Sequence, residues 1–137
     1  MRTLALSLVA LALPVAAAGI PAERLEASIQ PKLGRPYVWG ASGARAYDCS
    51  GFVWRALLDA GVLLKRTTAR KMFYSLAPVR PADRSAAGTL VFFDQVHHVG
   101  LVRNQAEFYH SSTSHGTRLD HFDPYWRRLV SGYRSIR

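Results

Sequence analysis

Residues 21–30 and residues 50–60 both carry apolar side chains at helical spacing, so the pattern predicts an amphipathic helix in each stretch. In the second stretch the side chain of Asp48 can cap the helix start, and Gly61 is well placed to end the helix. Cys49 would then lie at the amino terminus of this helix.

Beyond these helices the spacing of apolar positions changes to that of strands. The pattern predicts strands at residues 89–94, 98–103 and 107–112, joined by short polar turns, and a last strand on the edge of the sheet within residues 129–137. Residues 65–85 are polar and basic and contain two prolines, so we expect a connecting segment with one helical turn. Helices followed by an antiparallel meander indicate an α+β domain, with its N-terminal helices packed on a central antiparallel sheet.

The start of the chain has the pattern of an export signal. Arg2 is followed by an almost uninterrupted apolar run over residues 4–15 and by three alanines, which is typical of a cleaved secretory signal peptide. We therefore expect residues 1–18 to be removed and residues 19–137 to form a single exported domain in the periplasm or outside the cell. A retained membrane anchor is the alternative interpretation.

Composition adds a charge signal to this picture. The chain has 137 residues, 49% of them hydrophobic, which suits one compact domain. Eighteen Lys and Arg against nine Asp and Glu give a formal net charge of +9, which favours an anionic partner. Nucleic acid, anionic lipid and an acidic wall polymer would all be attracted, and scattered, solvated arginines would give the same total.

Cys49 is the one cysteine of the chain. An exported protein with a single thiol cannot form an internal disulfide, so the residue is an intermolecular bridge, an inert buried side chain or a reactive thiol. The amino terminus of a helix favours a thiolate, because its free N–H groups carry partial positive charge. The position therefore predicts a thiol with a lowered pKa.

Five histidines are candidate bases for this thiol. They are His97, His98, His110, His115 and His121. His98 and His110 lie on neighbouring predicted strands, and a turn with an odd number of residues, such as 103–105, places them opposite one another with about 5 Å between their Cβ atoms. An even turn would put them on opposite faces. We expect His97 to face away from His98, and the last two histidines to lie in a polar loop.

These residues fit a Cys-His-His triad. Cys49 would attack a carbonyl carbon, His98 would take and return the proton, and His110 would fix the orientation of the His98 ring. A zinc site that uses the same three side chains is a competing arrangement. No HExxH or CxxC pattern accompanies them, so we expect neither a metal nor another cofactor.

Residues 37–40 read Tyr-Val-Trp-Gly and residues 48–51 read Asp-Cys-Ser-Gly. This ordered pair of motifs resembles the NlpC-type cell-wall cysteine peptidases, in which a Tyr-x-Trp-Gly loop leads into Asp-Cys-Ser-Gly at a helix start. Residues 88–93, 98–101 and 108–110 are similar to the strands of the same family. The resemblance thus covers nearly the whole chain beyond the predicted signal.

The resemblance implies a papain-like α+β fold and hydrolysis of peptide bonds in the stem peptides of peptidoglycan, typically between γ-D-glutamate and diaminopimelate or lysine. Carried over by position, Cys49 is the nucleophile, His98 the base and His110 the third polar residue. The family's loop tyrosine corresponds to Tyr37, whose hydroxyl would stabilise the oxyanion together with the backbone N–H of Cys49.

Two further positions matter in the resemblance. Asp48 and Ser50 line the substrate cleft in some members and would hold the free amino end of a stem peptide, although simple helix capping explains Asp48 equally well. Many members have a second glycine after Trp-Gly where this chain has Ala41, so we expect a difference in the loop backbone or in the width of the cleft.

The leading hypothesis is a monomeric, exported cysteine endopeptidase that acts on peptidoglycan without a cofactor. The alternative is a non-catalytic basic envelope protein that binds anionic wall polymers or lipid. A nucleic-acid binder is disfavoured, because export and the lack of a reading helix or stacking motif count against it. The sequence identifies no regulatory or inhibitor protein.

Overall fold

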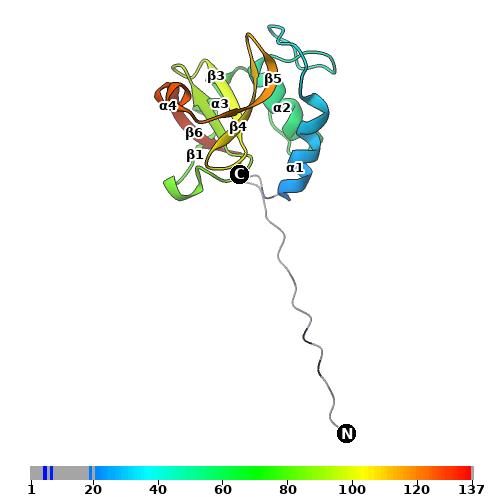
Figure 1. Ribbon diagram of the computed structural model, residues 1–137, viewed down its shortest axis with the longest axis vertical. Helices are drawn as coiled ribbons and strands as arrows, with labels where there is room; N and C mark the ends of the chain where they lie inside the picture. The colour runs from blue at the N-terminus through cyan, green and yellow to red at the C-terminus, as the bar shows by residue number, and fades with distance from the viewer. Residues whose placement is uncertain (1–4, 6, 8–18, 20, 137) are drawn as a thin grey trace.

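The computed structural model describes residues 5, 7, 19 and 21–136 (Figure 1). The predicted export signal, residues 1–18, lies almost entirely outside these residues and stays a prediction. In the described part of the chain, no helix is long and apolar enough to cross a membrane.

The helices follow the sequence pattern at the start of the chain and depart from it near the end. The α-helices are α1 (Ala22–Ile29), α2 (Cys49–Asp59), α3 (Ala69–Ser75) and α4 (Pro124–Leu129), and short 3-10 turns lie at Gln30–Lys32 and Pro81–Asp83. Asp48 caps α2 as predicted, since its carboxylate accepts from the N–H of Gly51 at 2.6 Å. The sequence pattern did not predict α4.

All strand pairs are antiparallel, and six strands form one sheet in the order β1-β6-β2-β3-β4-β5. The strands are β1 (Ala77–Pro78), β2 (Leu90–Phe93), β3 (His98–Val102), β4 (Glu107–Ser112), β5 (Gly116–His121) and β6 (Val130–Ser135). The α+β class is confirmed, but the edge position expected for the last strand is wrong. β6 pairs with β2 on one side and with β1 on the other, and β1 is too short to leave a pattern in the sequence.

The core is divided by the sheet into two layers. The side chains of β2 alternate between these two layers, because successive side chains of a strand point to opposite faces. Leu90 and Phe92 pack beneath α1, α2 and α3, whereas Val91 and Phe93 pack in a second cluster that Trp126 and Leu129 of α4 complete. Figure 1 shows α4 on the far side of the sheet from α1 and α2. The sheet thus carries a helix layer on both faces.

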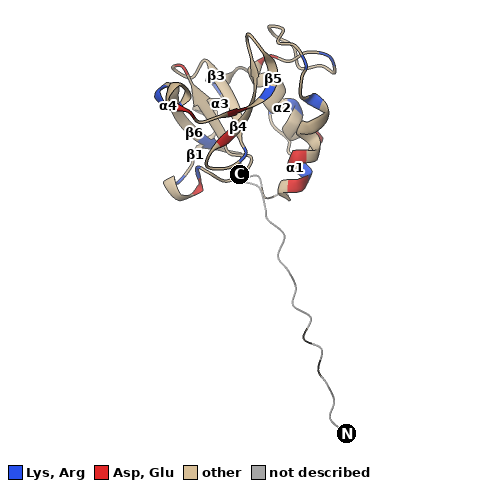
Figure 2. Ribbon diagram, in the orientation of Figure 1, with Lys and Arg blue, Asp and Glu red and all other residues tan. Residues whose placement is uncertain are grey.

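Basic side chains are spread over the fold rather than confined to one element. Arginines occur on α1, α4, β5 and β6 alike (Figure 2). This distribution matches scattered, solvated arginines better than a single binding stripe.

Candidate functional site

A cleft of about 660 Å³ opens where the amino terminus of α2 meets the end of the sheet. Cys49, His98 and Tyr37 all line it. The α2 start supplies the cysteine, the start of β3 supplies the histidine, and the loop before α2 supplies the tyrosine. Three residues singled out in the sequence analysis therefore meet at one hollow.

Cys49 is buried, with 8% of its surface exposed. Burial raises the pKa of its thiol, and the charge of Asp48 raises it further, although backbone N–H groups of Val99, Ser50 and Cys49 itself act in the opposite direction. The lowered pKa expected from the helix start is therefore wrong for the free protein. The helix N–H groups are present, but removal of the thiolate from water outweighs them.

A strained turn sets the position of the histidines beside the thiol. Asp94, Gln95 and Val96 have φ angles of 52°, 51° and 62°, a region that costs side-chain-bearing residues about 1–3 kcal/mol each. The N–H of Val96 donates to Ser131 Oγ at 3.1 Å, which helps hold the turn. The turn brings the carbonyl of His97 to 3.9 Å from Cys49 Sγ.

His97 does not face away from His98 as expected. The strand begins only at His98, so strand alternation does not apply to the residue before it. The ring of His97 instead bonds to the carbonyl of Asp94 at 2.8 Å, and both histidines line the cleft.

A hydrogen-bonded row of three side chains runs from the cleft across the sheet. His98 Nε2 lies 2.7 Å from His110 Nδ1, and His110 Nε2 lies 2.7 Å from Asp120 Oδ2. The ring of His110 is fully buried. His110 thus sits between the cleft histidine and a carboxylate.

The turn between β3 and β4 determines that the two histidines share a face. Val102 pairs with Phe108, so the turn has an odd length, as a shared face requires, but it is longer than residues 103–105. His98 consequently lies diagonal to His110 rather than directly opposite. The residue opposite His110 is Gly100, where a Cβ atom would come within 3.3 Å of His110 Cβ and 2.7 Å of the Tyr109 carbonyl.

The hydrogen bonds determine which ring nitrogens carry protons. Asp120 is an acceptor, so a neutral His110 donates through Nε2 and accepts through Nδ1. His98 must then donate through Nε2, which leaves its Nδ1 with a free lone pair. Two ligands of one tetrahedral zinc would lie about 3.3 Å apart, so the 2.7 Å contact between His98 and His110 fits a hydrogen bond rather than shared coordination.

The site holds His98 neutral and Asp120 charged. Burial, and then the charge of His110, lower the pKa of His98 to about 3. Burial alone would raise the pKa of Asp120, but the hydrogen bond from His110 and the charges of His110 and Arg118 outweigh it and lower that pKa. The neutral imidazole is the form that can accept a proton.

We expect the His98 ring to stay neutral down to about pH 4 in an NMR titration of the folded protein, because its pKa lies at about 3. An unfolded histidine titrates near 6.5, so between about 6.5 and about 3 the unfolded chain binds a proton that the folded chain does not. The free energy of unfolding should therefore fall as the pH falls through this window. Protonation of His98 near pH 6.5 in the folded protein would contradict the prediction.

Aromatic side chains cover the two histidines. Trp126 of α4 stacks on His98 with 6.0 Å between ring centroids and meets His110 edge-on at 5.0 Å. Phe108 lies 4.8 Å from the His110 ring on the same side of the sheet. This cover buries His110 and shields one side of His98, which is consistent with the low pKa of His98.

Asp120 and Trp126 were both missed in the sequence. Asp120 lies on β5, which carries mostly polar residues and was interpreted as a loop, and His121 is likewise on this strand rather than in a loop. A signal for Trp126 was present, because Asp123 followed by Pro124 is a helix-start pattern, and Asp123 does accept from the N–H of Trp126 at 2.9 Å.

Asp48 and Ser50 lie behind the thiol. Both residues are buried, and neither is among the described residues that line the cleft. Asp48 accepts from the N–H of Gly40 at 3.0 Å as well as from Gly51, and the guanidinium of Arg66 bonds to both Asp48 oxygens and to Ser50 Oγ. These contacts support the capping interpretation of Asp48, and they give a function to Arg66 in the connecting segment.

Tyr37 reaches the cleft from a loop that is tied to the rest of the domain. Its backbone bridges to Tyr47. Burial raises the pKa of its hydroxyl, and the charges of Cys49 and Asp48 raise it further, so the phenol keeps its proton. A protonated hydroxyl beside the thiol is a hydrogen-bond donor.

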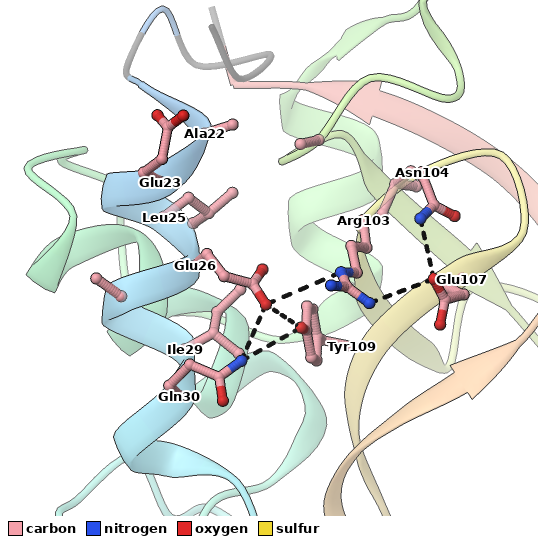
Figure 3. A pocket seen from close by; sticks show the side chains of 13 residues that line it. Ala22, Glu23, Leu25, Glu26, Ile29, Gln30, Arg103, Asn104, Glu107 and Tyr109 are labelled. Atoms are coloured by element: carbon pink, nitrogen blue, oxygen red, sulfur yellow. Dashed lines mark hydrogen bonds and ion pairs between the residues drawn. The ribbon is translucent and has the colours of Figure 1, made fainter. Parts of the chain in front are cut away.

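A second hollow, of about 610 Å³, lies between α1 and the turn that joins β3 to β4 (Figure 3). All three glutamates of the chain line it, namely Glu23, Glu26 and Glu107. Figure 3 shows Glu26 bonded to Tyr109 and Arg103 across the hollow. No Cys, Ser or His is among the described residues that line it, so this hollow, unlike the first cleft, brings no thiol and histidine together.

Comparisons with known proteins agree with the fold and the motifs. A family model described as the NlpC/P60 family matches residues 34–135. The peptidoglycan DL-endopeptidase CwlO of Bacillus licheniformis is 31% identical over 107 residues, which are 71% of this chain and 24% of that protein. The chain spans less than half the length of the first curated relatives it matches.

Solved structures show the same fold. NlpC2 from Trichomonas vaginalis superposes with a TM-score of 0.72 at 28% identity, over 84% of this chain and 46% of that one. RipD from Mycobacterium tuberculosis, described as a non-catalytic NlpC/p60 domain protein adapted to peptidoglycan binding, gives a TM-score of 0.65 at 17% identity, over 83% of this chain and 95% of that one. The second likeness shows the fold alone.

Proposed function

Because this chain belongs to the NlpC/P60 family, we propose that it is a cysteine peptidase that hydrolyses stem peptides of peptidoglycan. The observation that carries the proposal is the row His98–His110–Asp120, which ends at the cleft that also holds Cys49. A neutral imidazole with a free lone pair that lines the same cleft as a thiol is the combination that nucleophilic catalysis requires.

In the proposed mechanism, His98 Nδ1 takes the proton of the Cys49 thiol as Sγ attacks the scissile carbonyl carbon. The C–N bond then breaks, and His98 returns the proton to the leaving amine. Water attacks the acyl-enzyme with His98 again as the base, which releases the acid and restores the thiol. His110 and Asp120 keep the His98 ring in the required tautomer. Because the pKa of the thiol is raised, proton transfer accompanies attack rather than precedes it.

The oxyanion is proposed to lie between the Tyr37 hydroxyl and the backbone N–H of Cys49. Such donors are worth about 3 kcal/mol each in the transition state. For Asp48 and Ser50, contact with the free amino end of a stem peptide would require Arg66 to give up its bonds to them. Their present bonds support a role in holding the start of α2.

The proposed substrate bond is the one between γ-D-glutamate and diaminopimelate or lysine, and the proposed location is the periplasm or the cell exterior. The apolar segment at the start of the chain supports export. A relative named as a peptidoglycan endopeptidase supports the polymer as substrate. We further propose that the domain acts as a monomer without a cofactor.

Digestion of purified peptidoglycan and of defined stem peptides, with products identified by mass spectrometry, tests the proposal. The protein should release fragments whose masses name the bond, and a Cys49→Ala variant should release none. Binding of stem peptides without any fragment would instead support the non-catalytic alternative, in which a basic envelope protein holds wall polymers.

Asp120→Asn is expected to lower kcat on a stem peptide by about tenfold, because the amide keeps the shape but loses the charge that fixes the His110 tautomer. Asp120 acts through His110, so the NMR signals of the His98 and His110 ring protons should move as well. Asp94→Asn is the matched control, since Asp94 lines the cleft with an exposed side chain. Equal effects of the two substitutions would mean that only the charge of the cleft matters.

A further inference from the structure

We propose that Arg118 binds a free carboxylate of the substrate on the β5 side of the catalytic histidines, and thereby selects peptides in which the glutamyl α-carboxylate next to the scissile bond is not amidated. This inference rests on the proposed function, and it assigns a ligand chemistry to one wall of the cleft.

The sheet places Arg118 beside the catalytic row. Arg118 is the register partner of His110 in the β4–β5 pair, so their side chains leave the sheet on the same face, with Cβ atoms about 5 Å apart. Arg118 also lines the cleft. A substrate group held by its guanidinium would therefore lie within one strand spacing of the histidines.

The guanidinium keeps donors available for a ligand. Its Nη2 pairs with Asp120 Oδ1 at 3.1 Å, but 42% of the Arg118 side chain is exposed against 20% of the Asp120 side chain. Asp120 also lines the cleft, but its Oδ2 bonds to His110 and its Oδ1 to Arg118, so the guanidinium is the more exposed member of the pair. A guanidinium can pair with a second carboxylate through its remaining N–H groups.

The charged side chains that line the cleft lie on opposite sides of it. Among the described residues that line it, Arg118 is the one Lys or Arg, and the two acids are Asp94 on the opposite side and Asp120 beside Arg118, already paired with Arg118 and His110. Asp94 directly follows β2, and Arg118 lies on β5, three strands away in the sheet order, which is a separation of about 14 Å. Asp94 forms no ion pair with another described residue, whereas the charge of Asp120 is shared between His110 and Arg118. A substrate carboxylate is thus repelled more at the β2 side than at the β5 side, where the exposed guanidinium of Arg118 attracts it.

The proposed substrate offers such a group. In a γ-glutamyl bond the carbonyl under attack belongs to the side-chain carboxyl of glutamate, so the α-carboxylate of the same residue remains free and is a few bonds away. Pairing of this carboxylate with Arg118 would orient the glutamyl residue in the cleft. Amidation of this carboxylate removes its charge but keeps its shape. A comparison of the free and the amidated peptide therefore measures the effect of the charge alone.

The test compares binding of two peptides to the protein carrying Cys49→Ala, so that the measurement does not depend on hydrolysis. The peptides are L-alanyl-γ-D-glutamyl-diaminopimelate and its analogue with a carboxamide in place of the glutamyl α-carboxylate, and affinities are measured by calorimetry. We expect the carboxylate peptide to bind about tenfold more tightly. Arg118→Gln should reduce this ratio to about one, and Arg118→Lys should retain part of it.

Arg55→Gln is the matched control for loss of one positive charge. Arg55 is as exposed as Arg118, at 43%, and pairs with Asp59 at 3.1 Å on α2, outside the cleft lining. Arg55→Gln should leave the ratio between the two peptides unchanged.

Several outcomes would overturn the inference. They are equal affinity for the two peptides, a ratio that survives Arg118→Gln, equal weakening of both peptides by that substitution, and no binding of either peptide. Preferential binding of the carboxylate peptide that depends on Arg118, together with no cleavage by the unsubstituted protein, would support the subsite and refute the proposed hydrolysis.

Discussion

Cys49→Ala and His98→Ala should each lower kcat/KM on a stem peptide by about 10⁴-fold or more, and the double variant should be little worse than either single one. The reason is that the two groups act in one step. Without the thiol there is no nucleophile, and without the imidazole the thiol, whose pKa burial raises, keeps its proton. Single-turnover rates of peptide cleavage measure the effect.

His121→Ala is the control for removal of a histidine. His121 is exposed on β5 and is not among the described residues that line the cleft, so the rate should change little. Multiplicative losses in the double variant would show that Cys49 and His98 act independently. In that case a different base would have to be sought, and His97, which shares the cleft, would be the first candidate.

The sequence predicted the parts of the site that are set by local pattern. Asp48 and the apolar stripe placed Cys49 at a helix start, which depends on a few neighbouring residues and is readable from spacing. The sequence put His98 and His110 on one face only if the turn between their strands had an odd length. The structure supplies that length, which spacing alone left open.

The remaining parts of the site depend on contacts between distant segments. Asp120 reaches His110 from a strand whose residues are mainly polar, so no apolar alternation marked it. Arg66 meets Asp48 across eighteen positions of the chain. The raised pKa of the thiol depends on how deeply the helix start is buried, and burial is a property of the assembled fold.

The loop before α2 packs so closely on the helix that one added methyl group should disturb the site. A Cβ atom at Gly51 would lie 2.1 Å from the carbonyl oxygen of Ala41 and 2.9 Å from Asp48 Oδ1. That same carbonyl accepts the N–H of Asp48 at 2.8 Å. Ala41 itself has no positive φ, so its backbone does not need the glycine found in many relatives.

Gly51→Ala is accordingly expected to lower the free energy of unfolding by about 2–3 kcal/mol, because the methyl group must push the loop away from the helix. It should also lower kcat/KM by about 100-fold, since the displaced loop carries Tyr37 and the helix start carries Cys49.

Gly43→Ala is the matched control. It lies in the same loop with no atom within 4 Å of the added Cβ, so stability should change by less than about 1 kcal/mol. Urea unfolding and peptide cleavage measure the two effects. If Gly51→Ala behaved like Gly43→Ala, the loop would have to yield freely, and the oxyanion position proposed between Tyr37 and the Cys49 N–H would lose its rigid support.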